Sequence, residues 1–323
     1  MSTPPPAPFE APGAASGARL GPGARVVVVA PAGPPRDLAR LAAGLDALRA
    51  RGLDVTVLRD GPPEVAFAPH GFLSASDEAR ADEFNRAVAL APDAIVCVRG
   101  GYGTLRLLPL VDYAAARRRP TLLVGYSDVT ALQLALLAKA GWRSVSGPMV
   151  GVEWGQMDAD EERLFWRLVS GATGELSGPR GEALGPLRPG RAEGMLVGGN
   201  LALVARLVGT PYLPDLTGAI LFLEDVYEEP YKIDGLLAQL RLAGVLERLG
   251  GLVYGAFTDD ASTLDTSFTT DEVLDYYAAF VNGPVARGLA YGHFSPKLPV
   301  PIGVRARLHV DDTRARLDTL EPL

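Results

Sequence analysis

Short apolar runs alternate with amphipathic stretches over residues 25–169. The runs are rich in valine, isoleucine and leucine, which is typical of strands buried on both faces of a sheet, and the segments between them carry leucine and alanine at helical spacing. Strands are expected at 26–30, 54–58, 94–98 and 121–124, and helices at 36–51, 76–90 and from 131 onward. This alternation predicts an α/β fold with a parallel sheet covered by helices on both faces.

The pattern changes at residues 170–190, which are rich in glycine and proline and show no periodicity. We interpret this segment as the connection between two domains, residues 25–169 and residues 191–323. In the second domain, strands are expected at 219–223, 252–257 and 301–310, and helices at 201–208, 233–249 and 271–281. Residues 1–24 are rich in proline, alanine and glycine, and predict a flexible tail.

The composition narrows the possible partners. A formal net charge of −7 and a pI near 5.1 argue against a nucleic-acid partner. No apolar stretch of about 18 residues occurs and the N-terminus does not resemble a signal peptide, so no membrane partner and a cytoplasmic location are expected. The one cysteine, Cys97, lies in the apolar run AIVCV and is expected to be a buried hydrophobe rather than a reactive thiol.

Ser127 lies at the turn of the stretch LLVGYSDVT, residues 122–130, where a strand leads directly into a helix. A serine there projects beside the amide groups that start the helix, and these amides can hold developing negative charge. This is the arrangement of a nucleophile elbow, although the second glycine of G-x-S-x-G is missing. Serine before a helix is also typical of an ordinary N-cap, so both interpretations stay open at this point.

The loop RGGYGT, residues 99–104, also follows an expected strand. It does not complete the dinucleotide motif G-x-G-x-x-G, because Arg106 occupies the position of the last glycine, and the chain has no G-x-x-x-x-G-K-[ST] motif. The loop is either a tight turn that needs positive φ or a place where bare backbone amides approach a ligand oxygen. In the second case, it would supply a donor to an oxyanion hole beside Ser127.

Few other residues are candidates for chemistry. None of the three histidines lies in an H-E-x-x-H motif or a cysteine–histidine cluster, so no metal site is expected. His70 is expected in a loop, His309 at a surface or edge position, and His293 in a turn. Glu224 follows the apolar run AILFL, where a charge is costly unless it is paired. It is expected either to form a strand-end salt bridge, for example to Arg241, or to orient His293 as the base for a serine nucleophile.

Several motifs resemble, in the right order, the LD-carboxypeptidase family over about residues 26–308. They are GYSD around Ser127, RGGYG at 99–103, SGPM at 146–149, RAEG and GGNL within 191–201, LED at 223–225, and GH at 292–293 before LPVPIG. Members of this family are serine peptidases that remove a terminal D-amino acid from an L-centre in peptidoglycan peptides. The resemblance implies a catalytic triad of Ser127, His293 and Glu224. It also implies an oxyanion hole formed by the backbone amides of Gly101 and Asp128.

The family fold is a flavodoxin-like parallel-sheet N-terminal domain followed by a mixed, β-rich C-terminal domain, with the site in the cleft between them. The resemblance further implies a homodimer, a peptidoglycan-derived peptide substrate that releases D-alanine, and no cofactor. Three alternatives stay open: a microcin C immunity-type peptidase acting on peptidyl-nucleotides, a non-enzymatic binding module on the same fold, and a nucleotide-binding α/β protein. The tail and residues 259–270 match nothing in the family pattern.

Overall fold

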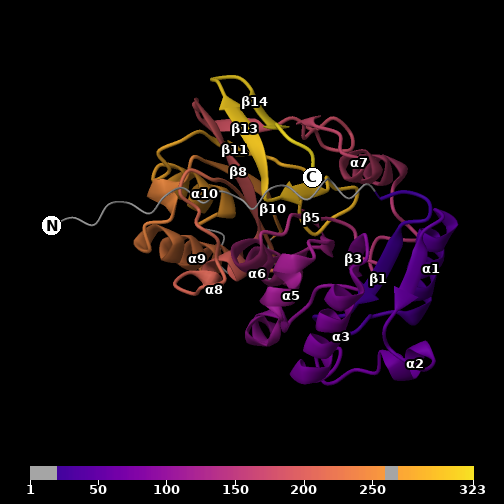
Figure 1. Ribbon diagram of the computed structural model, residues 1–323. Coiled ribbons are helices and arrows are strands. Elements are labelled where there is room, and N and C mark those ends of the chain that lie inside the picture. The colour runs from indigo at the N-terminus through magenta and orange to yellow at the C-terminus, as the bar shows by residue number, and fades with distance from the viewer. Residues whose placement is uncertain (1–19, 259–267) are drawn as a thin grey trace.

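Two β-sheets with helices packed around them make up the computed structural model, which describes residues 20–258 and 268–323 (Figure 1). The indigo and magenta elements of the N-terminal half surround one sheet, and the orange and yellow elements of the C-terminal half surround the other. The predicted tail, residues 1–24, and the loop 259–270 lie largely outside the described residues.

The first sheet confirms the flavodoxin-like fold. Its strands are β1 (Arg25–Val29), β2 (Asp54–Val57), β3 (Ala94–Cys97), β4 (Leu122–Gly125), β5 (Ser144–Ser146) and β12 (Val300–Ile302). The order β2-β1-β3-β4-β5 is parallel throughout, and β12 adds an antiparallel edge next to β5. Sheets with this order bind ligands beyond the carboxyl ends of their strands, where the loops after β3 and β4 lie.

The helices around the first sheet follow mostly from local features of the sequence. They are α1 (Leu38–Ala50), α2 (Pro63–Ala66), α3 (Asp77–Leu90), α4 (Thr104–Leu107), η1 (Leu108–Leu110), α5 (Tyr113–Arg118), η2 (Ser127–Val129), α6 (Thr130–Ala140) and α7 (Ala159–Val169). Ser76 caps α3, as predicted, by accepting a hydrogen bond from the amide of Ala79. The prediction omitted α7, although Asp158 caps this helix and acidic residues fill its first turn.

The second sheet is mixed, as the family resemblance implies. Its strands are β6 (Gly174–Glu175), β7 (Gly185–Arg188), β8 (Gly190–Asn200), β9 (Ile220–Val226), β10 (Gly251–Thr258), β11 (Val285–Arg287), β13 (Val304–Val310) and β14 (Ala315–Thr319). The central strands β8-β9-β10-β11 are parallel, and the outer strands pair antiparallel. The accompanying helices are α8 (Leu201–Leu207), α9 (Pro230–Leu242), η3 (Leu246–Arg248) and α10 (Thr270–Ala278).

Two segments cross the expected division of the chain. The presumed connection, residues 170–190, contributes the edge strands β6 and β7 to the second sheet. The single strand expected at 301–310 is divided at Gly303, whose φ of +85° turns the chain from β12 in the first sheet to β13 in the second. Domain boundaries at residues 169 and 191 therefore stay a prediction.

The prediction also omitted β8, whose sequence GRAEGMLVGGN is rich in glycine. Glycine weakens a strand by itself, but here it permits close approach of two backbones. A Cβ at Gly198 would lie 1.9 Å from the carbonyl oxygen of Phe222 on β9. Pairing with β9 and β13, rather than side-chain propensity, therefore makes this segment a strand.

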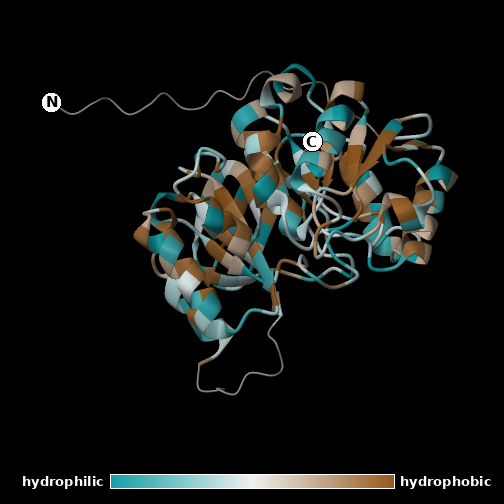
Figure 2. Cartoon of the chain, turned by 90° about the horizontal axis from the view of Figure 1, so that it is seen from below, coloured by the Kyte–Doolittle hydropathy of each residue, from teal (hydrophilic) through white to brown (hydrophobic). Residues whose placement is uncertain are grey.

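One hydrophobic core runs between the sheets. Leu132 and Leu136 of α6, Val204 of α8 and Phe222 of β9 belong to the same buried cluster. Hydrophobic residues predominate on the strands, whereas the helices carry both hydrophobic and hydrophilic residues (Figure 2). None of the helices within the described part of the chain is long and apolar enough to cross a membrane.

Candidate active site

Ser127 lies in the short turn η2, between the carboxyl end of β4 and helix α6. Its φ of +65° is uncommon for any residue other than glycine. The N-cap interpretation is wrong, because the starts of η2 and α6 carry no side-chain cap hydrogen bond in the described chain. The backbone instead has the strand–turn–helix geometry of a nucleophile elbow, which presents the hydroxyl at the edge of the sheet.

His293 joins Ser127 to Glu224. Its Nε2 lies 2.9 Å from Oγ of Ser127, and its Nδ1 lies 2.7 Å from Oε2 of Glu224. An ionised carboxylate only accepts hydrogen bonds, so Nδ1 carries the proton and Nε2 is left to accept from the serine hydroxyl. The side chain of His293 is 19% exposed and that of Glu224 is fully buried. A substrate can therefore reach the histidine but not the carboxylate behind it.

Arg241 is not the partner of Glu224. Strand β9 continues past Glu224, which therefore lies inside the strand rather than at its end. Arg241 donates instead to the hydroxyl of Tyr276 at 3.1 Å and stacks 3.5 Å from the centre of the Phe280 ring. The salt-bridge alternative is wrong, and the carboxylate is paired with His293.

The other two histidines and the cysteine lie outside this arrangement. His70 is exposed in a loop, as predicted. His309 is half-buried on the partly exposed face of β13, which fits the surface alternative, whereas the edge alternative is wrong because β13 pairs with both β8 and β14. Cys97 is fully buried, as predicted, and burial raises the pKa of its thiol. Residues 20–258 and 268–323 contain no group of three or more metal-ligating side chains.

The glycine-rich loop after β3 lies directly against Ser127. A Cβ at Gly100 would be 2.8 Å from Cβ and 3.1 Å from Oγ of Ser127, so a side chain there would displace the serine. Gly101 and Gly103 both have a φ of +115°, which favours glycine. The loop is therefore a positive-φ turn that also brings bare backbone to the serine, and its role as an oxyanion-hole donor stays a prediction.

Asp128 fastens this loop to the turn that carries Ser127. Its Oδ2 accepts a hydrogen bond from the amide of Thr104 at 2.9 Å, and the hydroxyl of Thr104 donates to the carbonyl oxygen of Asp128. Burial raises the pKa of the Asp128 carboxyl, and these bonds from Thr104 oppose that rise. The family motif implies a role only for the backbone amide of Asp128, and this role of its side chain has no signal in the local sequence.

A buried ionic network behind His293 was also missed. Lys297 forms an ion pair with Glu153, and its Nζ lies 3.8 Å from the centre of the Tyr126 ring. The hydroxyl of Tyr126 donates to the same carboxylate at 2.7 Å, and the ring lies edge-on to His293 with 5.2 Å between ring centres. Burial and the Glu153 carboxylate raise the pKa of Tyr126, which keeps it neutral. A lysine next to the apolar run LPVPI is the sequence feature that points to such a buried pair.

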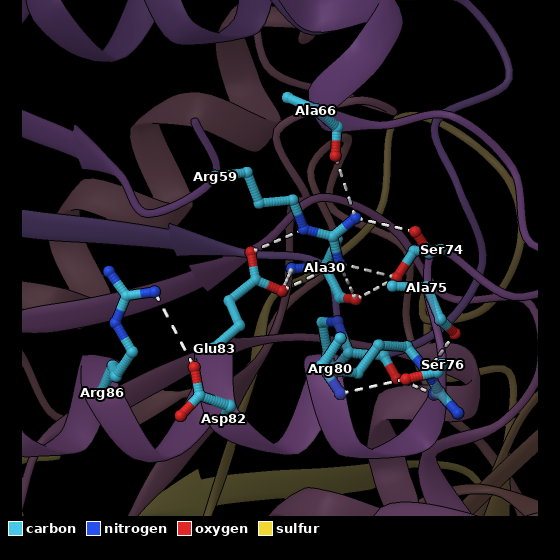
Figure 3. Close-up of polar contacts among 12 residues, drawn as sticks. Ala30, Arg59, Ala66, Ser74, Ala75, Ser76, Arg80, Asp82, Glu83 and Arg86 are labelled. Carbon is cyan, nitrogen blue, oxygen red and sulfur yellow. Dashed lines mark hydrogen bonds and ion pairs between the residues drawn. The ribbon is translucent and has the colours of Figure 1, made fainter. Parts of the chain in front are cut away.

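Two arginines hold the backbone beneath the glycine-rich loop. Arg80 is fully buried on α3 and donates to the carbonyl oxygen of Gly103 at 3.1 Å and to the loop after β1. Arg59 pairs with Glu83 at 2.9 Å, and Glu83 also accepts from the amide of Ala30 (Figure 3). These bonds fix the ends of β1 and β3, from which the loops of the site extend.

Comparison with known proteins identifies the family. A family model for the LD-carboxypeptidase N-terminal domain matches residues 26–147, and one for the LD-carboxypeptidase C-terminal domain matches residues 193–308. The chain belongs to the LD-carboxypeptidase family. The prediction from the sequence motifs is therefore confirmed, and membership of this family makes the chain a hydrolase of the carboxypeptidase class. Ser127, Glu224 and His293 all lie within the matched segments.

The matches to known relatives extend over most of this LD-carboxypeptidase. The chain is 34% identical over 307 residues to a probable murein peptide carboxypeptidase from Bacillus subtilis, and the match covers 93% of each protein. The structure resembles that of a muramoyltetrapeptide carboxypeptidase from Oxalobacter formigenes, with a TM-score of 0.79, 31% identity and coverage of 91% of this chain and 98% of that one. It is also 28% identical over 275 residues to the microcin C7 self-immunity protein MccF from Escherichia coli, covering 75% of this chain and 78% of that protein.

Proposed function

We propose that the chain is a serine-type LD-carboxypeptidase that releases terminal D-alanine from murein tetrapeptides. Ser127 is the nucleophile, His293 the general base, and Glu224 the acid that orients the imidazole. The observation that carries the proposal is the continuous pair of hydrogen bonds, 2.7 Å and 2.9 Å long, from Glu224 through His293 to a serine with a φ of +65°. A non-enzymatic binding module has no need for a buried carboxylate in this position, and burying one is costly.

In the proposed reaction, Oγ of Ser127 attacks the scissile carbonyl carbon while Nε2 of His293 takes the hydroxyl proton. The imidazolium is stabilised by Glu224, and the amides of Gly101 and Asp128 donate to the tetrahedral oxyanion. Collapse of the intermediate breaks the C–N bond, and His293 returns the proton to the leaving amine of D-alanine. Water that is deprotonated by the same histidine then hydrolyses the acyl-serine and regenerates the enzyme.

The choice of substrate rests on the relatives. The names of the B. subtilis and O. formigenes proteins specify murein peptides and muramoyltetrapeptides, and each match covers more than nine-tenths of this chain. The likeness to MccF, at 28% identity, supports a second candidate, a peptidase that acts on peptidyl-nucleotides. A homodimer stays a prediction from the family resemblance, and a cytoplasmic location stays a prediction from the composition and the N-terminal sequence.

Mass spectrometry of the products from a free murein tetrapeptide and from a peptidyl-adenylate tests this proposal. We expect release of D-alanine from the tetrapeptide, and a loss of about 10³-fold or more in kcat for Ser127→Ala with an unchanged fold. Ser170→Ala removes an exposed serine at the end of α7 and should keep full activity. Activity near that of the wild type in Ser127→Ala would remove Ser127 from the mechanism. Cleavage of the peptidyl-adenylate alone would replace the substrate with the second candidate.

A further inference from the structure

Arg99 carries a positive charge whose direct hydrogen-bond partner is a neutral carbonyl oxygen. This half-buried residue begins the glycine-rich loop after β3, and its Nη1 donates to the carbonyl oxygen of Pro34 at 3.0 Å. No acidic side chain within the described residues forms an ion pair with it. Burial lowers the pKa of Arg99 and the charge of the exposed Arg36 nearby lowers it further, whereas Tyr126 and the Asp128 carboxyl oppose that shift. Arg99 therefore lies near a second cation and feels Asp128 only through space.

The neighbouring cations of the site are neutralised in the folded chain. Lys297 pairs with Glu153 behind the histidine, and Arg106 on α4 pairs with Asp77 at 2.7 Å. Their charges are already used to hold the loops together. Arg99 differs because its recorded partner is a neutral carbonyl oxygen, which leaves several of its five N–H donors for a ligand.

The guanidinium of Arg99 lies beside the proposed oxyanion hole. A Cβ at Gly101 would come within 3.3 Å of Nη2, and a Cβ at Gly33 would come within 3.0 Å of Nη1. The amide of Gly33 donates to the carbonyl oxygen of Gly100 at 3.1 Å, so the two loops meet here. Because these neighbours are glycines, neither loop covers the guanidinium with a side chain.

We propose that Arg99 binds the terminal carboxylate of the peptide substrate and thereby restricts cleavage to the last peptide bond; this inference rests on the function proposed above. In a peptide, the C-terminal carboxylate carbon lies about 3–4 Å from the preceding carbonyl carbon, which is the reacting atom in a carboxypeptidase. A residue that recognises this carboxylate must therefore lie close to the oxyanion hole. The planar fork of an arginine matches both carboxylate oxygens, and the bond to Pro34 holds the fork in place before the substrate arrives.

The test compares the free murein tetrapeptide with the same peptide amidated at its C-terminus. Wild-type kcat/KM should favour the free acid by about 10- to 100-fold, as expected for charge-assisted hydrogen bonds. Arg99→Gln should lower kcat/KM for the free acid by a similar factor and leave the value for the amide within about three-fold, so that the preference disappears. Arg99→Lys keeps the charge without the fork and should keep part of the preference. Arg106→Gln, which alters a paired arginine next to the same loop, should keep all of it.

Equal losses on the two peptides in Arg99→Gln would overturn the proposal and leave Arg99 as a support for the Pro34 loop. A folded Arg99→Gln variant that keeps the full preference for the free acid would overturn the proposal as well. So would a loss of the preference that appears in Arg99→Lys alone. If the wild type cleaves both peptides equally, the carboxylate assignment fails while the hydrolase function stands. If the wild type releases neither D-alanine from the free acid nor D-alaninamide from the amide, the proposed function fails and the assignment fails with it. Circular dichroism and Tm establish that each variant is folded.

Discussion

At the scale of single residues, the position of Ser127 depends on a neighbour that has no side chain. A Cβ at Gly100 would meet Cβ of Ser127 at 2.8 Å and the carbonyl oxygen of Tyr126 at 3.2 Å. Gly100 is not among the residues with positive φ, so its backbone conformation alone would permit alanine. Glycine is therefore required at position 100 because a side chain there would collide with Ser127, the proposed nucleophile.

We expect Gly100→Ala to lower kcat/KM by about 100-fold, because a displacement of about 1 Å at a reacting atom has an effect of this size. The cost in the free energy of unfolding should be about 1–3 kcal/mol, as for other overpacked sites. Steady-state kinetics and thermal unfolding measure both effects.

Gly235→Ala is the matched control for this variant. Gly235 is exposed on α9, and a Cβ there would meet nothing within 4 Å. It should keep full activity and raise the free energy of unfolding by about 1 kcal/mol, since alanine favours a helix. Unchanged kinetics in Gly100→Ala would show that the elbow tolerates movement of Ser127.

At the scale of elements, Asp225 connects strand β9 to helix α8. Its Oδ2 accepts from the amide of Ala202 at 3.0 Å, and its Oδ1 accepts from the side chain of Asn200 at 2.8 Å. The same Asn200 nitrogen lies 3.3 Å from Oε1 of Glu224. Burial raises the pKa of Asp225 to about 6 in spite of these hydrogen bonds. The junction that supports Glu224 therefore contains a group that titrates within an accessible pH range.

We expect this carboxyl to make stability depend on pH. Its pKa is about 6 when folded and about 3.8 when unfolded, so the folded state binds the proton more tightly. Between roughly pH 4 and 6, the contribution of Asp225 to the free energy of unfolding therefore falls as pH rises, by up to about 3 kcal/mol. The side chain introduced by Asp225→Asn cannot titrate, so the variant should lack this pH-dependent contribution to the free energy of unfolding.

Urea unfolding of the wild type and Asp225→Asn across this range provides the measurement. The free energy of unfolding of the wild type minus that of the variant should decrease steadily from the acidic end to neutral pH. A constant difference would contradict the raised pKa, and an increasing difference would show that the hydrogen bonds at Asp225 outweigh its burial.

At the scale of the whole molecule, the two sheets are built from interleaved parts of the chain. Strand β12, from the C-terminal half, pairs with β5 of the first sheet, whereas the next strand, β13, pairs with β8 of the second. Arg143 and Glu321 form an ion pair at 2.7 Å between the two halves. Together with the shared core around α6, these contacts couple the stability of one sheet to that of the other.

We therefore expect the chain to unfold in a single cooperative transition. The calorimetric and van't Hoff enthalpies should agree. Tryptophan fluorescence reports on the first half, since Trp142, Trp154 and Trp166 are the three tryptophans of the chain, and it should follow the same transition as far-UV circular dichroism. Two resolved calorimetric peaks, or probes with different midpoints, would show that the halves unfold independently.

Local pattern determined those elements whose cause lies within one segment. Strands β1 and β3 appear in the sequence as apolar runs, and Ser76 marks the start of α3, because burial on both faces and N-capping each act over a few residues. The family motifs likewise singled out Ser127, Glu224 and His293, each of which lies in a short characteristic stretch. Strand β8 was not predicted, because its glycines permit close pairing with a neighbouring strand but produce no alternation of apolar and polar side chains.

Only the tertiary structure decided which groups hold these residues in place. The bond from Thr104 to Asp128 joins positions 24 apart, and the pair of Lys297 with Glu153 joins positions 144 apart. The need for glycine at position 100 likewise arises from a neighbouring strand end. Periodicity and propensity describe how one segment meets the core or the solvent, and carry no information about which distant segment lies against it. Short motifs therefore predict which residues form the proposed site, whereas the geometry of the site depends on the path of the chain through two sheets.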